Sequence, residues 1–122
     1  MIGYVTLGTN DLPRAVAFYE KLFEINGAKQ AWKSDRGVGW GTSKTSPSLA
    51  VMTPYDGQAA TVGNGTMVAI IVDSRDKVDA MHRRALELGG RDEGPVGERF
   101  PGFYAGYFRD LDGNKLAVFC TR

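Results

Sequence analysis

The side chains best able to do chemistry in this chain are few and lie far apart in the sequence. His82 is the one histidine, the residue type that most often exchanges protons near neutral pH. Its position beside Met81 and Ala85 in a predicted helix indicates a structural role. Cys120 ends an apolar segment, which is typical of a buried, unreactive thiol. The sequence therefore offers no evident pair of nucleophile and base.

Two short motifs resemble ligand-binding loops but lack essential parts. Asp110 and Asp112 are spaced like the first ligands of a calcium loop, whose later ligands are missing here. Residues 110–114 therefore predict a hairpin turn in which Gly113 adopts a positive φ. The glycines of residues 37–41 are not followed by a predicted helix, so they do not form a dinucleotide-binding fingerprint.

Aromatic side chains are the remaining candidates for binding. Aromatic walls with a few phenolic hydroxyls suit a flat or apolar small molecule. Strands also favour aromatic residues for packing alone, so both interpretations stay open for this set. The set comprises Trp32, Trp40, Tyr55, Phe100, Phe103, Tyr104, Tyr107 and Phe119.

The elements that must position these residues follow one order twice. In each half an alternating segment predicts a strand, a capped apolar stripe predicts a helix, and shorter extended segments follow. The first helix begins near Asn10 and Asp11 and ends at Gly27, and the second begins at Ser74 and ends at Gly89 and Gly90. The predicted strands are residues 2–9, 28–32, 38–41, 49–53, 66–73, 91–96, 104–109 and 115–120.

The two halves align at an offset of about 62 or 63 residues, which indicates an internal duplication. We therefore predict an α+β fold of two βαβββ modules, with module one at about 1–60 and module two at about 65–122. Together they would form one domain, residues 1–122, with a curved mixed sheet and a central cleft. Such a cleft is the natural place for a ligand.

The composition excludes several classes of protein. Fifteen basic and 14 acidic residues leave a net charge of +1, which predicts neither a nucleic-acid nor a membrane partner. A 43% hydrophobic and 24% charged content is that of an ordinary globular chain. With a single cysteine and no basic start or apolar signal core, we expect a cytoplasmic protein.

Two segments resemble a known family. Residues 3–7 and 10–19 resemble the opening strand and helix of the vicinal oxygen chelate superfamily, which includes glyoxalase I, bleomycin-resistance proteins and extradiol dioxygenases. Residues 107–116 are similar to its closing hairpin, with Leu111 in place of the usual proline. The resemblance spans essentially the whole chain. It implies the fold of glyoxalase, bleomycin-resistance protein and dihydroxybiphenyl dioxygenase, and it implies a homodimer.

The resemblance also implies four inward positions that usually hold a divalent metal. In this chain they fall on Tyr4, Val51, Met67 and Ala117. Valine, methionine and alanine do not offer the imidazole nitrogen or carboxylate oxygen that such metals prefer. We therefore expect no metal and no cofactor.

The leading hypothesis is a metal-free member of this superfamily that binds a small apolar or aromatic molecule in the cleft between the modules. The predicted ligand-binding residues are Tyr4, Thr6, Trp40, Val51, Met67, Arg99, Phe103, Tyr104, Tyr107, Ala117 and Phe119. The segment 98–104 is expected to form a flap at the rim of the cleft, with Arg99 as its positive charge.

Two alternatives would make the protein an enzyme, and the sequence does not decide whether it is one. One is a lyase, isomerase or dioxygenase that uses a divalent metal through a non-standard ligand set. The other is a metal-free enzyme in which Tyr4, the weak candidate for a catalytic residue, transfers a proton.

Overall fold

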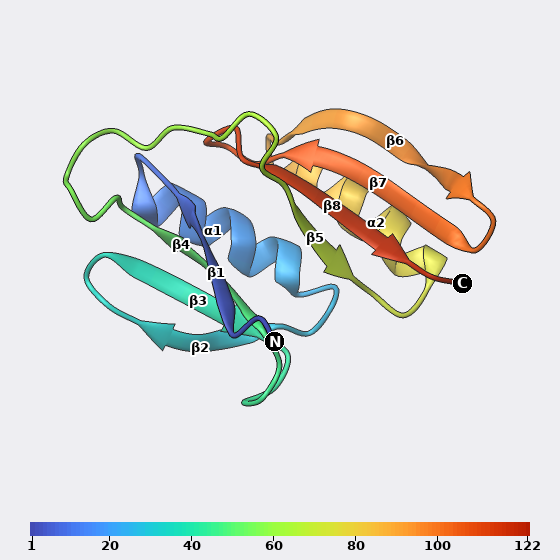
Figure 1. Cartoon of the computed structure of the whole chain (residues 1–122), viewed down its shortest axis with the longest axis horizontal. Helices are drawn as coiled ribbons and strands as arrows, with labels where there is room; N and C mark the ends of the chain where they lie inside the picture. The colour runs from blue at the N-terminus through green and yellow to red at the C-terminus, as the bar shows by residue number, and fades with distance from the viewer. The chain divides into compact units, whose positions relative to one another are not determined.

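The computed structural model describes residues 1–122, and the chain divides into two compact units. Unit 1 is Met1–Thr61 and unit 2 is Val62–Arg122. Each unit has one strand, one helix and three further strands in chain order (Figure 1). The predicted α+β fold of two βαβββ modules is thus confirmed, with a four-stranded mixed sheet in each module.

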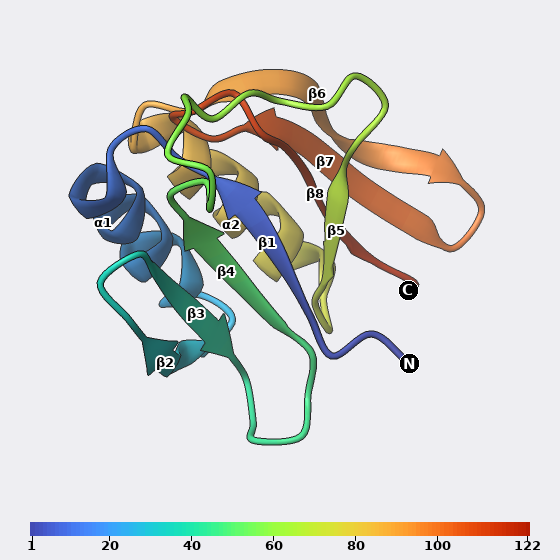
Figure 2. The same ribbon diagram turned by 60° about the vertical axis from the view of Figure 1, so that its left-hand side comes forward.

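Unit 1 contains β1 (Tyr4–Gly8), α1 (Leu12–Phe23), β2 (Lys29–Lys33), β3 (Gly37–Gly41) and β4 (Ser48–Met52). The strand order is β1-β4-β3-β2, with β1 parallel to β4 and the other pairs antiparallel (Figure 2). The helix begins where the Asp11 side chain accepts a hydrogen bond from the Arg14 amide, with a proline in the first turn. Its buried stripe packs on Trp40 of β3 through Tyr19 and Phe23.

Unit 2 contains β5 (Val68–Ile71), α2 (Arg75–Glu87), β6 (Arg91–Phe100), β7 (Phe103–Arg109) and β8 (Lys115–Cys120). The strand order is β5-β8-β7-β6, with β5 parallel to β8 and the other pairs antiparallel. The predicted cap of α2 is confirmed, since the Ser74 side chain accepts from the Lys77 amide. Figure 1 shows α2 lying across one side of this sheet.

The predicted flap at residues 98–104 is wrong. β6 continues to Phe100 and β7 begins at Phe103, so this segment is the tip of a β-hairpin. Pro101 and Gly102 form the turn, and Gly102 has the φ of +80° that a type II turn requires after proline. The sequence predicted only residues 91–96 of this strand, because a glycine follows at residue 97 and glycine is rare inside regular strands.

The turn of the closing hairpin is Asp110-Leu111-Asp112-Gly113-Asn114, and its hydrogen bonds explain this choice of residues. The buried Asp110 carboxylate accepts hydrogen bonds from the Asp112 amide at 3.0 Å and the Asn114 amide at 2.9 Å. Its other oxygen accepts from Asn114 Nδ2 at 3.0 Å. Gly113 has a φ of +90°, as predicted. The turn is therefore built around one carboxylate.

Candidate functional site

The second sheet has a covered side and a side opposite its helix, which we call the open face. Leu116, Val118 and Cys120 of β8 are fully buried on the side of α2, where Tyr104 of β7 donates a hydrogen bond to Asp79 of the helix. Because successive strand residues point to opposite sides, the open face carries the residues between these. They are Lys115, Ala117 and Phe119 of β8 and Phe103, Ala105, Tyr107 and Arg109 of β7.

Three phenylalanines form a stack at one end of the open face, here called the aromatic row. Phe100 and Phe103 stack with ring centroids 4.7 Å apart, and Phe103 and Phe119 stack at 5.1 Å. Ile71 of β5 pairs with Phe119 in the parallel register and is 64% exposed, while Phe100 is 59% exposed. Large apolar side chains gathered at an exposed position commonly mark a binding surface.

Cationic side chains gather around Tyr107 at the other end of the open face. The Arg99 guanidinium lies 5.3 Å from the centre of the Tyr107 ring, and Lys115 Nζ lies 5.7 Å from the same ring. Both distances fall within the range of cation–π attraction. Arg109 Nε donates to Glu93 Oε1 at 2.6 Å, and this hydrogen bond is the main cause that lowers the pKa of Glu93. We call Arg99, Lys115 and Tyr107 the cationic cluster.

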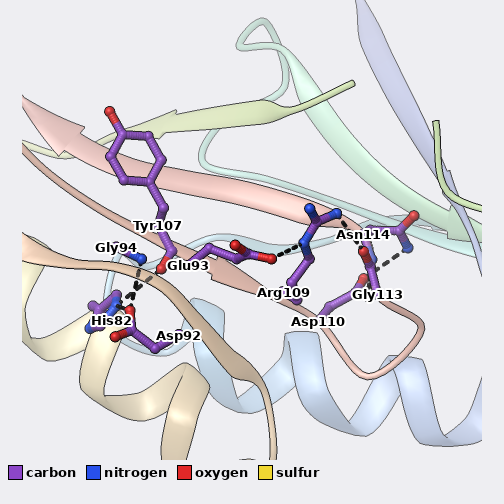
Figure 3. Close-up of polar contacts among 9 residues, drawn as sticks. All are labelled: His82, Asp92, Glu93, Gly94, Tyr107, Arg109, Asp110, Gly113 and Asn114. Carbon is purple, nitrogen blue, oxygen red and sulfur yellow. Dashed lines mark hydrogen bonds and ion pairs between the residues drawn. The ribbon is translucent and has the colours of Figure 1, made fainter. Parts of the chain in front are cut away.

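His82 lies on the opposite side of the sheet from the Tyr107 ring, as Figure 3 shows. Its Nε2 is 3.1 Å from Asp92 Oδ1 and 3.1 Å from the Tyr107 carbonyl oxygen, and the residue is 7% exposed. The Gly94 amide donates to Asp92, which with His82 lowers the pKa of that carboxyl group. These contacts tie α2 to β6 and β7, which is the structural role that its sequence position indicates.

The first sheet also has an open face, opposite α1. By the observed register it carries Tyr4 and Thr6 of β1 and the three glycines of β3. Trp32 of β2 lies over Gly39 so closely that a Cβ there would be 2.4 Å from its indole nitrogen. Tyr4 is 63% exposed and its hydroxyl forms no hydrogen bond within the chain. Within unit 1 the Tyr4 hydroxyl is therefore not hydrogen-bonded to a base that could accept its proton.

Three of the predicted ligand-binding residues face the helices. Trp40 is 2% exposed and donates from its indole nitrogen to Glu20 of α1 at 2.9 Å. Val51 pairs with Val38 on the same side and is 1% exposed. Tyr104 points to Asp79, and that hydrogen bond is the main cause that raises the pKa of the phenol. We correct these three assignments, because strand alternation alone does not tell which side a helix covers.

The other predicted residues fall on an open face or beside one. Arg99, Phe103, Tyr107, Ala117 and Phe119 share the open face of the second sheet, which Met67 borders just before β5. The sequence analysis did not select Ile71 or Lys115 as binding residues. Ile71 lies two residues from Ala69, and Lys115 lies two residues from Ala117, so strand alternation places both on the same face as these alanines.

The four positions that the family resemblance assigns to a metal do not form a donor set. Val51 faces α1, and its neighbours Ala50 and Met52 on the open side carry no carboxylate or imidazole. Tyr4, Met67 and Ala117 offer at best a phenol and a thioether. Nowhere in the structure do three His, Cys, Asp or Glu side chains come together as a metal site requires. The residues present do not fit a divalent metal.

Two βαβββ modules in one chain, each with an open sheet face, define the class of protein. A model of the Glyoxalase/Bleomycin resistance protein/Dioxygenase superfamily matches residues 1–118, and the chain belongs to this superfamily. A search of curated proteins found no significant match. No helix of the structure is long and apolar enough to cross a membrane.

Solved structures agree with this family. A glyoxalase/bleomycin resistance protein from Albidiferax ferrireducens is 31% identical, with a TM-score of 0.92 over 100% of this chain and 99% of that one. A family enzyme from Burkholderia phytofirmans is 17% identical, with a TM-score of 0.77 over 98% of each chain. A lactoylglutathione lyase from Agrobacterium tumefaciens is 22% identical, with a TM-score of 0.70 over 98% of this chain and 92% of that one. The last two share the fold alone.

Proposed function

We propose that this protein binds a small apolar or aromatic molecule, and that the open face of the second sheet supplies the main contacts. The observation that carries the proposal is the aromatic row, in which three rings stack and Phe100 remains 59% exposed. A stacked and partly exposed set of rings offers a flat ligand both dispersion contacts and burial of apolar area. The large buried side chains of unit 2 lie on the other side of the sheet, under α2, while on this face Ala105 and Ala117 are also buried.

Beside the aromatic row the exposed Ala69 leaves room for such a ligand, next to Ala117, which is only 3% exposed. Ala69 and Ala117 pair on the open face, each two residues away from Ile71 and Phe119 along its strand. Residues two apart in a strand are separated by roughly 6.6 Å, which is about the width of an aromatic ring. A ring resting on Ala69 would lie beside Ile71 and Phe119. The binding residues we retain are Arg99, Phe103, Tyr107, Ala117 and Phe119, with Met67 at the border.

We propose that binding does not require a metal ion. The support is chemical, because the positions implied by the family carry a phenol, a valine, a thioether and a methyl group. Calorimetry with nickel, zinc, manganese and iron, on protein purified without chelators, tests this part. Stoichiometric binding of any of them would favour a metal-dependent lyase, isomerase or dioxygenase instead.

A neutral probe tests the proposed surface. We expect 2-naphthalenemethanol to shift the backbone amide signals of Phe103, Ala117 and Phe119 in a nuclear magnetic resonance titration. Ala69→Trp fills the exposed alanine beside Ala117 and should abolish these shifts. Arg83→Trp adds the same side chain on the exposed surface of α2 and should leave them unchanged. Shifts confined to other residues, or their survival in Ala69→Trp, would contradict the proposal.

We also propose a cytoplasmic homodimer. The homodimer follows from the family resemblance, and the compartment from the single cysteine, Cys120, which is buried and unpaired. Sedimentation velocity tests the assembly: a species of twice the chain mass of 13.3 kDa is expected, and a monomer at all concentrations would contradict it.

A further inference from the structure

We propose that the ligand is an aromatic carboxylate, held with its ring on the aromatic row and its anionic group at the cationic cluster. This inference rests on the proposed function, because it takes the open face of the second sheet as the binding surface. It adds the charge of the ligand and the residues that select for it.

The charges of the open face do not balance. Its basic residues are Arg91, Arg99, Arg109 and Lys115, and its one acidic residue is Glu93. Glu93 is engaged by Arg109 at 2.6 Å, and the nearby Lys115 and Arg91 also help to lower its pKa. Neither Arg99 nor Lys115 has a carboxylate within ion-pair distance. The face therefore holds a surplus of positive charge although the whole chain has a net charge of only +1.

Arg99 is placed by the chain rather than left free in solvent. A bulged register between Glu98 and Phe100 puts its guanidinium over the glycines of β6, where a Cβ on Gly97 would be 3.1 Å from Arg99 Nη1. Arg99 Nη2 donates to the Pro95 carbonyl, and the ring of Tyr107 lies beneath the group. A guanidinium has five N–H donors, so most of them remain for a planar carboxylate.

The distance between the two parts of the face suits one or two fused rings. Tyr107 pairs directly with Ala117, and Phe119 lies two residues further along β8. Two residues correspond to roughly 6.6 Å along the strand. Lys115 lies the same distance from Ala117 in the opposite direction along β8. A naphthalene ring that packs on Phe119 and extends along β8 would thus bring a carboxylate on its far edge to Tyr107, where both cations approach.

A charged probe and its neutral analogue test the inference. We would follow the fluorescence of 2-naphthoate and of 2-naphthalenemethanol during titration with the full chain at fixed ionic strength. We expect the carboxylate to bind about tenfold more tightly, as one charge-assisted hydrogen bond at a partly exposed site would give. Arg99→Gln and Lys115→Gln should each lower this preference several-fold and leave binding of the alcohol unchanged. Arg83→Gln removes an equal charge from the surface of α2 and should alter neither affinity.

The outcomes separate this inference from the proposed function. Equal affinity for the two probes, or a preference that survives in both Arg99→Gln and Lys115→Gln, overturns the carboxylate and leaves the aromatic surface standing. A preference lost equally in Arg83→Gln shows general attraction to positive charge and also overturns it. Failure of both probes to bind overturns the proposed function and the inference with it.

Discussion

Replacement of Asp110 by alanine tests how the closing hairpin holds unit 2 together. The carboxylate accepts hydrogen bonds from the Asp112 amide, the Asn114 amide and Asn114 Nδ2 at 2.9–3.0 Å. Figure 3 shows Asp110 beside Asn114. Asp110 and Asn114 are 6% and 7% exposed, so water has little access to the two donors of Asn114. The half-buried Asp112 amide is more readily hydrated after the substitution.

The expected loss follows from these donors. A buried donor left without a partner costs about 1–3 kcal/mol, so the two donors of Asn114 predict a loss of about 3 kcal/mol from the free energy of unfolding. That is a large share of the roughly 5–15 kcal/mol that keeps a domain folded. Asp110→Asn keeps one acceptor oxygen for the two backbone amides but places an amide group against Asn114 Nδ2. Because this leaves one buried donor without an acceptor, it should cost about 1–3 kcal/mol, less than Asp110→Ala.

Urea denaturation followed by circular dichroism measures these losses, and amide hydrogen exchange at Asn114 reports the hairpin directly. Asp35→Ala, in an exposed turn of unit 1, is the control and should leave the midpoint unchanged. A midpoint for Asp110→Ala equal to that of Asp35→Ala, or an Asn114 amide that stays protected, would refute the reasoning.

Three further predictions concern the sheet of unit 2. Gly106→Ala places a Cβ 2.8 Å from Val96 Cγ1 and should destabilise the protein by about 1–3 kcal/mol in urea; an unchanged midpoint would show that the neighbour yields freely. Tyr104→Phe removes the hydrogen bond to Asp79 and should cost about 1 kcal/mol at pH 8. Because the pKa of this phenol is raised above 10.0 in the folded chain, the loss should shrink as the pH rises past that value, and a pH-independent difference would contradict it. Glu93→Gln removes the ion pair with Arg109. Because the folded pKa of Glu93 lies below its ordinary 4.5, the stabilisation from this pair should be present above pH 4.5 and disappear at lower pH. A difference in stability between the variant and the unchanged protein that persists in acid would count against it.

The helices and their ends could be predicted from local chemistry. Asp11 and Ser74 cap them as expected, and the apolar stripes face the sheets. β8 runs over Lys115–Cys120, the residues predicted for it, because its apolar run begins directly after the unambiguous turn at residues 110–114. These features depend on interactions between residues close in sequence, which a single sequence displays.

Features that depend on pairing between distant residues were harder to predict. β6 was predicted only as residues 91–96, whereas it extends to Phe100 through three shifts in register. Trp40 was assigned to the ligand, but its side is fixed by Tyr19 and Glu20 on α1, which alternation in β3 cannot reveal. Lys115 was not selected, because its place beside Tyr107 depends on the antiparallel register of β7 and β8.

A crystal structure of the chelator-treated protein with 2-naphthoate tests the central claim most directly. The account predicts the naphthalene ring against Phe103 and Phe119, with its carboxylate within hydrogen-bonding distance of Arg99 or Lys115 and no cation between ligand and protein. Naphthoate bound on another surface would contradict the account. So would a ligand that occupies this face only after a divalent metal, held by protein side chains, has been restored.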